Sequence, residues 1–334
     1  MTEIKSDSGS VQRVLVTGSR GKSSTVRFLH AAMSDAGLQS YARITGVVPR
    51  ELGPDGNQTI SRSSGAHVEE MRWWLGQLPA STQCIVLENS AISPDLQGLA
   101  GRWLRPDITV LTNTLPDHQE VWGPTRACAA QVLAGGIPGG GQVILPGELK
   151  TDNHLLKLLK RRRCTVIFSE PVRGGEEDHQ SINRGLALTA AKRLGLSGTA
   201  ALRAMLRVQP DIHDFRVVNY AGAELAMAFS ANDITSTRNL FRSLRWCEQE
   251  TRMMYNHRAD RPGRFRSFLD WLNNSNWRDV MIIGDKPGFR SGSARYLDIK
   301  KKEGLLRLFE PGDKIFGCGN IAGLPLSLAS VNKR

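Results

Sequence analysis

The stretch VLVTGSRGKSSTVRFLHAAM, from Val14 to Met33, decides the fold class of this chain. A short apolar run leads into two glycines, and a continuous helical pattern follows them. Gly18 and Gly21 allow the backbone to turn tightly and to direct N–H groups at phosphate oxygens. Lys22 can reach terminal phosphates, Ser23 can ligate Mg²⁺, and the following helix presents its positive end. The stretch therefore predicts a phosphate-binding loop between a strand and a helix.

This loop is shorter than the common phosphate-loop pattern. That pattern has a glycine six positions before the lysine, where this chain has Val16. The alternative is a tight strand-to-helix turn with an incidental lysine, but glycine, lysine and two hydroxyls coincide directly after a strand, which favours phosphate binding. We include Ser19, Arg20 and Ser24 among the expected nucleotide contacts.

The composition is typical of a globular protein: 334 residues, 40% hydrophobic and 23% charged. No window approaches the roughly 18 apolar residues of a membrane helix, and the first residues lack a signal-peptide core, so we expect a cytoplasmic protein. The five cysteines are widely spaced, which predicts reduced side chains without a metal-binding or redox role. The net charge of +12 attracts polyanions. The basic runs at 157–163 and 300–302 are interpreted as solvated faces, because no aromatic residues are interleaved with them.

Strands and helices alternate along the chain, which predicts a mostly parallel sheet covered on both faces. The pattern breaks near 209–215, which predicts a lead-in over 1–12, a domain with the phosphate loop over 13–210 and a smaller Rossmann-like α/β domain over 211–334. Polar strand ends in both domains suggest a cleft over a nucleotide. The expected strands are 13–18, 40–46, 84–89, 107–113, 141–147, 164–170, 224–233, 252–260, 280–286 and 314–320, and the expected helices are 22–36, 66–78, 124–135, 151–161, 182–196 and 197–208.

Further candidates follow the apolar strands. Glu88 ends one strand, where a carboxylate could hold Mg²⁺ or could simply be solvated. Asn113 ends another, and Asp117 and His118 follow it in a turn. His118 could ligate a metal while Asp117 orients it. The alternative is a helix-capping aspartate beside a surface histidine.

In this order, the motifs T-G-x-x-G-K-S, strand-end Glu and N-x-x-x-D-H-x-E resemble those of the Mur ligase superfamily of ATP-dependent amide ligases, whose phosphate loop is the shortened kind. The blocks TGSRGKSSTVRFL, ITGV, IVLENSAISPDLQ, DHQEVWGPT, FSANDITSTRNL, NHRADR and GCGNIAG are similar to the ATP-dependent ligase subunit of poly-γ-glutamate (capsule) synthase. The resemblance runs from residue 14 to about 323. It implies a Mur-ligase-like α/β fold and amide formation through an acyl phosphate, with ATP and Mg²⁺ as cofactors.

The resemblance also implies roles for individual residues. Lys22, Glu88 and His118 would be catalytic, and Ser23, Glu88 and His118 would hold the metals. Asn113 would lie near the base, Arg216 would contact phosphate and Asp233 the ribose. The expected substrate residues are Arg43, Thr45, Asn232, Asn256, Arg258 and Arg261.

Three departures from the family pattern affect these expectations. No hydrophobic segment precedes the loop, which leaves either a soluble relative or a chain that docks onto a membrane-protein partner. No lysine lies between Asn113 and Leu149, so the second metal is expected to be held differently or to be absent. The glycine that usually precedes the arginine at the domain junction is replaced in DIHDFR, which weakens the assignment of Arg216.

The favoured substrates are glutamate and a polyanionic acceptor, and a homo-oligomer is a further expectation. Two other functions stay open: a soluble ligase that joins one amino acid to a small acid, and a nucleic-acid-associated ATPase. The latter would be stimulated by nucleic acid in a salt-dependent manner. Glu88 and the D-H block argue against it. The intact Lys22 and Ser23 argue against a non-catalytic subunit.

Overall fold

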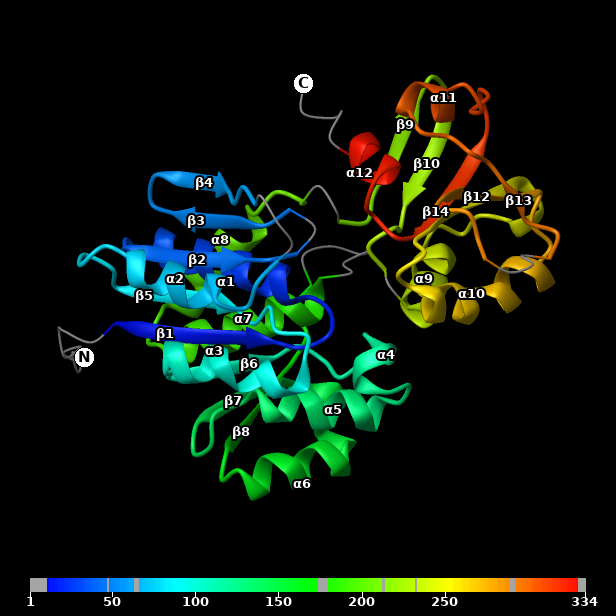
Figure 1. Cartoon of the computed structure of the whole chain (residues 1–334). Coiled ribbons are helices and arrows are strands. Elements are labelled where there is room, and N and C mark those ends of the chain that lie inside the picture. Colours follow the sequence, from blue (N-terminus) through cyan, green and yellow to red (C-terminus); the bar gives the residue numbers. More distant parts are fainter. Residues whose placement is uncertain are drawn as a thin grey trace. The chain divides into compact units, whose positions relative to one another are not determined.

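The structure is a computed structural model that describes residues 11–46, 48–62, 66–173, 180–211, 214–231, 233–288 and 292–329. The chain divides into two compact units, Met1–Val208 and Gln209–Arg334 (Figure 1). The boundary expected from the sequence, between residues 210 and 211, lies close to this division.

The first unit is built on an eight-stranded sheet with the order β4-β3-β2-β5-β1-β6-β7-β8. The phosphate-loop strand β1 (Gln12–Thr17) lies between β5 (Cys84–Glu88) and β6 (Ile108–Leu111) and is parallel to both. Strands β2 (Ser40–Ile44), β7 (Gln142–Pro146) and β8 (Thr165–Ser169) continue the parallel arrangement. Only β3 (Arg50–Gly53) and β4 (Gly56–Thr59) are antiparallel among the described strands of this sheet, and they form a hairpin at its edge.

Apolar residues cover both faces of this sheet, because successive side chains of a strand point to opposite sides. Val14 and Val16 join one buried cluster with α1 (Lys22–Asp35), α7 (Ser181–Arg193) and α8 (Gly198–Leu206). Leu15 points to the other face, where α2 (Glu70–Gln77) and α3 (Gln97–Leu104) pack. On the same face of the sheet, α5 (Arg126–Gly135) and α6 (Asn153–Arg161) cover β7. The short helix α4 (Gln119–Trp122) and the 3-10 turns η1 (Pro94–Leu96) and η2 (Gly147–Thr151) complete the unit.

Helix starts in the first unit differ in how they are capped. The side chains of Thr125, Asp152 and Ser197 each accept a backbone N–H in the first turn of α5, α6 and α8. Helix α1 instead follows Gly21, which has φ +76° and offers no capping side chain. The first N–H groups of α1 therefore stay available for a phosphate group.

The second unit contains a six-stranded sheet with the order β13-β12-β11-β14-β10-β9. Strand β9 (Val217–Tyr220) pairs antiparallel with β10 (Ala223–Met227). The other strands are parallel: β11 (Thr251–His257), β12 (Asp279–Gly284), β13 (Arg295–Tyr296) and β14 (Lys314–Gly319). Helices α9 (Ile234–Ser243) and α10 (Pro262–Asn274) cover one face, and α11 (Lys302–Leu306) and α12 (Leu324–Ala329) cover the other. The turn η3 (Glu248–Glu250) precedes β11.

The predicted α/β class with mostly parallel sheets is confirmed, and every expected strand is present. The expected ranges do not include the β3–β4 hairpin, the strands β9 and β13, or the helices α3, α4, α9, α10, α11 and α12. All five cysteines are free, as expected. None of the described helices is both long and apolar enough to cross a membrane.

Candidate functional site

The predicted phosphate loop, residues 18–24, follows β1: residues 18–21 form the turn, and Lys22, Ser23 and Ser24 form the first turn of α1. Gly18 has φ +129°, and a Cβ atom at this position would lie 2.1 Å from Thr112 Oγ1. Lys22 Nζ donates to the carbonyl of Gly18 at 2.7 Å, so the ammonium folds back over the loop. Burial lowers the pKa of Lys22, and the negative charges of Glu88 and Asp117 partly oppose this shift. The loop thus holds a partly desolvated lysine in the position where phosphate oxygens would replace water.

Glu88 lies at the carboxyl end of β5, next to the loop strand, and is only 3% exposed. Ser23 Oγ donates to its carboxylate at 2.9 Å. From the other side, the N–H and the hydroxyl of Thr45 each donate to it at 3.2 Å. This glutamate therefore joins the carboxyl end of β2 to the first turn of α1. It is not the solvated strand-end residue of the alternative interpretation.

Asn113 and Thr112 follow β6 and hold the loop from the opposite side. The Asn113 amide accepts from Arg20 N at 3.2 Å and donates to Arg20 O at 3.0 Å. Thr112 Oγ1 donates to the same carbonyl at 2.5 Å. Ser19 Oγ donates to the carbonyl of Leu115 at 2.6 Å. Asn113 thus positions the loop here, and its contact with a base stays a prediction.

His118 lies in a strained backbone conformation beside the loop. It has φ +45°, which is uncommon for a residue other than glycine and is often found at functional sites. Its Nε2 lies 3.7 Å from the carboxylate of Asp117, and its ring packs on Trp122. Asp117 also forms an ion pair with Arg20 at 2.9 Å. A distance of 3.7 Å exceeds that of a hydrogen bond, so both orientation of the ring by Asp117 and metal ligation by His118 stay predictions.

Ser23 and Glu88 fit a Mg²⁺ ion by the chemistry of their donor atoms. Mg²⁺ prefers oxygen ligands and is commonly held by one or two protein groups, with phosphate oxygens and waters completing the octahedron. Ser23 supplies a hydroxyl and Glu88 a buried carboxylate within 2.9 Å of it. Over the described part of the chain, no three His, Cys, Asp or Glu side chains are grouped closely enough to hold an ion unaided. The protein therefore presents an incomplete oxygen site that a bound nucleotide would complete.

Arg43, expected at the substrate, is buried at 1% exposure on β2. Its guanidinium forms an ion pair with Glu70 at the start of α2. Burial lowers the pKa of Arg43, and the charge of Glu70 opposes this. Arg62 also pairs with Glu70, at 2.7 Å. Arg43 thus connects β2 to α2 in this structure, and its role toward an acceptor stays a prediction, like that of Thr45.

Three candidates of the second unit have structural partners of their own. Arg216 donates to the carbonyls of Asp211 and Ala329 at 3.0 and 2.9 Å. Asp233 caps α9 by accepting from Ser236 N at 2.8 Å. Arg261 immediately precedes α10. The phosphate, ribose and substrate roles of these three residues stay predictions. Asn232 lies outside the described residues.

Asn256 and Arg258 are brought together at the carboxyl ends of β11 and β12, where they line one pocket of about 790 Å³. Asn256 is 2% exposed and donates to the carbonyls of Asn320 and Ala322. Arg258 pairs with Asp260 at 2.6 Å. The volume lies within the range of small-molecule sites, about 300–1,000 Å³. The pocket is also lined by His257, Gly284, Asp285, Ile299, Lys300, Lys301, Lys302, Glu303, Ala322, Gly323, Leu324 and Ser327.

Sequence reasoning missed several residues of these two sites. Lys300 and Lys301 are exposed, as the interpretation as a solvated face expects, but the sequence did not indicate that the lysines 300–302 also line the pocket with Arg258. Thr112 could have been found from its place at a strand end. Asn183 of α7 had no sequence signal, although a Cβ atom on Gly21 would lie 2.3 Å from its amide oxygen.

Comparison with known protein families covers both units. The Mur ligase middle domain matches residues 16–181, and the poly-gamma-glutamate synthase CapB C-terminal domain matches residues 212–333. The chain belongs to the Mur ligase superfamily. Its second unit is the C-terminal domain of the CapB type, as the sequence motifs predicted. This Mur ligase is therefore an ATP-dependent amide ligase, and the nucleotide it uses explains the loop at Lys22.

Individual relatives agree with this assignment. The PGA synthase CapB of Bacillus subtilis (strain 168) is 25% identical over 93% of this Mur ligase and 87% of the relative. The capsule biosynthesis protein CapB of Bacillus anthracis is 26% identical over 93% of this chain and 74% of the relative. The solved structure of MurF from Acinetobacter baumannii has a TM-score of 0.69, with 12% identity over 96% of this chain and 75% of that one.

A second solved structure shows the same fold. It is the bifunctional folylpolyglutamate synthase/dihydrofolate synthase from Yersinia pestis, complexed with AMPPNP and a Mn ion. It has a TM-score of 0.67, with 17% identity over 96% of this chain and 88% of that one.

Proposed function

We propose that this Mur ligase uses ATP and Mg²⁺ to add glutamate to a γ-carboxylate of an acidic acceptor, as in poly-γ-glutamate synthesis. The observation that carries the proposal is the convergence of Lys22 and Ser23, at the start of α1, with Glu88, at the end of the neighbouring strand β5. The CapB relatives and the matched CapB C-terminal domain support the substrate class.

The proposed reaction has two steps. An acceptor carboxylate oxygen attacks the γ-phosphorus of ATP, the bond to the β-phosphate oxygen breaks, and ADP leaves. The glutamate amine then attacks the acyl carbon, the bond to the phosphate oxygen breaks, and phosphate and the surplus amine proton are released. Bound Mg²⁺ would supply charge neutralisation, and Ser23 and Glu88 would hold it. Lys22 would stabilise charge on the transferring phosphoryl group, where positioning and electrostatics provide most of the catalysis.

The basic pocket of the second unit supports an acidic substrate. Arg258 and the lysines 300–302 supply positive charge at the carboxyl ends of β11 and β12, where ligands of open α/β sheets commonly bind. We assign this pocket to the carboxylates of the glutamate or of the acceptor. A membrane-protein partner and a homo-oligomer stay predictions that co-purification would test.

The test is nucleotide turnover by the purified protein with Mg²⁺. Amino acids are supplied singly with short γ-linked glutamate acceptors or with small acids, and nucleic acid forms a separate arm. ADP and AMP are both followed, because an acyl phosphate route releases ADP. We expect ADP release that requires glutamate and an acceptor. Turnover with a small acid alone would indicate the other ligase, and turnover stimulated only by nucleic acid would contradict amide ligation.

Matched variants assign the residues. Lys22→Ala and Glu88→Gln should each lower kcat on the order of 10²–10³-fold. Lys157→Met removes an exposed lysine from α6 and should leave kcat unchanged. Lys301→Ala should raise the KM for the acidic substrate with unchanged ATP affinity, whereas Arg307→Ala, outside the pocket, should not. Full activity in Glu88→Gln would exclude the proposed metal site.

A further inference from the structure

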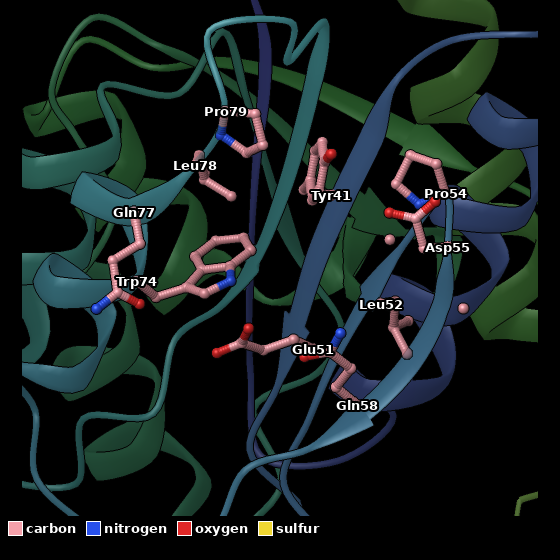
Figure 2. Close-up of a pocket in the computed structure, with 12 residues that line it drawn as sticks. Tyr41, Glu51, Leu52, Pro54, Asp55, Gln58, Trp74, Gln77, Leu78 and Pro79 are labelled. Carbon is pink, nitrogen blue, oxygen red and sulfur yellow. The ribbon is translucent and has the colours of Figure 1, made fainter.

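A second pocket, of about 210 Å³, lies in the first unit between the strands β2, β3 and β4 and the C-terminal half of α2 (Figure 2). Its walls are formed by Tyr41, Leu52 and Trp74, and its polar groups by Glu51 and Asp55. The remaining lining residues are Gly53, Pro54, Gly56, Gln58, Gln77, Leu78 and Pro79.

This pocket is separate from the nucleotide site. Tyr41 lies near the amino end of β2, whereas Thr45, which bonds to Glu88, follows the carboxyl end of the same strand. At about 3.3 Å per residue, the two positions are roughly 13 Å apart along the strand. A ligand in this pocket would therefore not occupy the phosphate loop.

The side chains that line this pocket favour a positively charged ligand. Glu51 and Asp55 bring two carboxylates, and no Lys, Arg or His is among the described residues that line the pocket, although the chain has a net charge of +12. Arg43 is opposite Glu51 in the strand register and attracts it electrostatically, while its guanidinium forms its ion pair with Glu70 on α2. The aromatic faces of Trp74 and Tyr41 add an attraction for a cation.

The pocket also presents a hydrogen-bond donor. Trp74 is only 4% exposed, and its Nε1–H donates to no acceptor among the described residues. Figure 2 shows the nitrogen-bearing edge of this indole on the side of the Glu51 carboxylate. This N–H is not among the fully buried, unsatisfied atoms of the described side chains, so it reaches solvent and is free to donate to a ligand in the pocket. The fitting ligand therefore carries both a cation and an oxygen acceptor.

Size and surroundings favour a polypeptide over a free metabolite. The volume is below the roughly 300 Å³ at which small-molecule sites begin, so it suits one side chain. Strand β4 lies at the open edge of the sheet, and all four of its residues are exposed. A strand edge of this kind can pair with an added extended segment, whose backbone also supplies carbonyl acceptors.

We propose that this pocket binds a lysine or arginine side chain of a partner polypeptide that lies along the free edge of β4. The cationic group lies between Glu51 and Asp55, and a carbonyl of the same segment accepts from Trp74 Nε1. The proposal is independent of the ligase substrates, because no residue of the pocket belongs to the candidate functional site.

The test uses the full-length protein and calorimetric titration with short, extended peptides. Each peptide has one central arginine or lysine, and matched peptides have citrulline or norleucine at that position. We expect binding of the cationic peptides only. Glu51→Gln should weaken it about tenfold, as for the loss of a charged hydrogen bond, and Trp74→Phe, which keeps an aromatic ring, about fivefold.

Controls make the outcome decisive. Glu148→Gln removes an exposed carboxylate elsewhere in the first unit and should leave peptide affinity unchanged. Circular dichroism and unaltered ATP turnover would verify that each variant is folded. Equal binding of neutral peptides, unaltered affinity in Glu51→Gln, or equal binding of free butylguanidinium would overturn the proposal. So would self-association of the protein that Glu51→Gln abolishes, because the occupant would then be a second copy.

Discussion

At the scale of single residues, the phosphate loop depends on the absence of a side chain at Gly18. Its φ of +129° is unfavourable for other residues, and Thr112 and Asn113 leave no room for a Cβ atom. Gly37, just after α1, also has a positive φ, +80°, but no described atom lies within 4 Å of the position that a Cβ atom would take there. Comparing alanine substitutions at these two glycines therefore distinguishes the effect of backbone strain from the effect of a steric clash.

Gly37→Ala should lower the free energy of unfolding by about 1 kcal/mol and leave nucleotide affinity unchanged. Gly18→Ala should carry at least this strain, since its φ of +129° lies further from the left-handed region. It should also weaken binding of a non-hydrolysable ATP analogue by about tenfold or more, because the loop must shift. Urea unfolding and calorimetric titration measure the two quantities. Equal nucleotide affinity in both variants would contradict the assignment of Gly18 to the phosphate loop.

Glu69 and Glu70, adjacent at the start of α2, provide a second matched pair. Glu70 pairs with the buried Arg43 and with Arg62, whereas Glu69 lies 3.6 Å from the exposed Arg72. Glu70→Gln should destabilise the protein by about 3 kcal/mol, because a buried guanidinium loses its counter-charge. Glu69→Gln should cost less than about 0.5 kcal/mol. Urea midpoints would compare them, and similar losses would contradict the buried ion pair.

Some site residues could be predicted because the sequence shows both their residue type and their position just after an apolar strand. Lys22, Ser23 and Glu88 meet this condition, and the structure brings them together. The pairing of Arg43 with Glu70 could not be predicted in this way, since it spans 27 residues and depends on how α2 packs. The amide of Asn183 meets the loop only through the packing of α7.

At the scale of elements, α1 and β2 meet through a buried polar contact. His30 Nδ1 on α1 lies 3.1 Å from Oγ of Ser40, which is fully buried on β2. Burial lowers the pKa of His30 to about 4. The unfolded chain therefore binds a proton at higher pH than the folded one, so this contribution to stability is complete above about pH 6.5 and is lost as the pH falls toward 4.

We therefore expect the free energy of unfolding to decrease between pH 6.5 and pH 4, with at most about 3 kcal/mol attributable to His30. His30→Gln keeps a polar partner for Ser40 and should reduce this pH dependence. His154→Gln, at an exposed position on α6, should not. Urea unfolding at several pH values measures the effect, and identical profiles for all three proteins would contradict it.

Elements with a simple period were predicted, and those defined by local turns or by aromatic packing were not. The buried parallel strands are short apolar runs that end in polar residues. The β3–β4 hairpin has mixed polarity, although Pro54, Asp55 and Gly56 form a turn signal that was available in the sequence. Helix α10 is an exception: its buried residues Phe265, Phe268 and Trp271 recur at helical spacing, so its period was visible in the sequence.

At the scale of the whole molecule, each unit has its own hydrophobic core. Three buried clusters belong to the first unit and two to the second. Calorimetry of the full chain should therefore show two unfolding transitions. A non-hydrolysable ATP analogue at 100 times its Kd should stabilise the first unit by about 2.7 kcal/mol.

Core variants assign the two transitions. Leu29→Ala removes buried volume from the first unit and should lower only the transition that the nucleotide raises. Phe268→Leu should lower only the other. A single transition that both variants shift equally would show that the units unfold together.

The chain passes from one unit to the other once, between Val208 and Gln209. The two family matches end and begin on either side of this point, at residues 181 and 212. A single recombination breakpoint there would exchange the part of the gene that encodes the second unit and leave every core residue of the first unit in place. Under the proposed function, descent can therefore vary the acidic substrate that the second unit binds without altering the phosphate loop and Glu88 of the first unit.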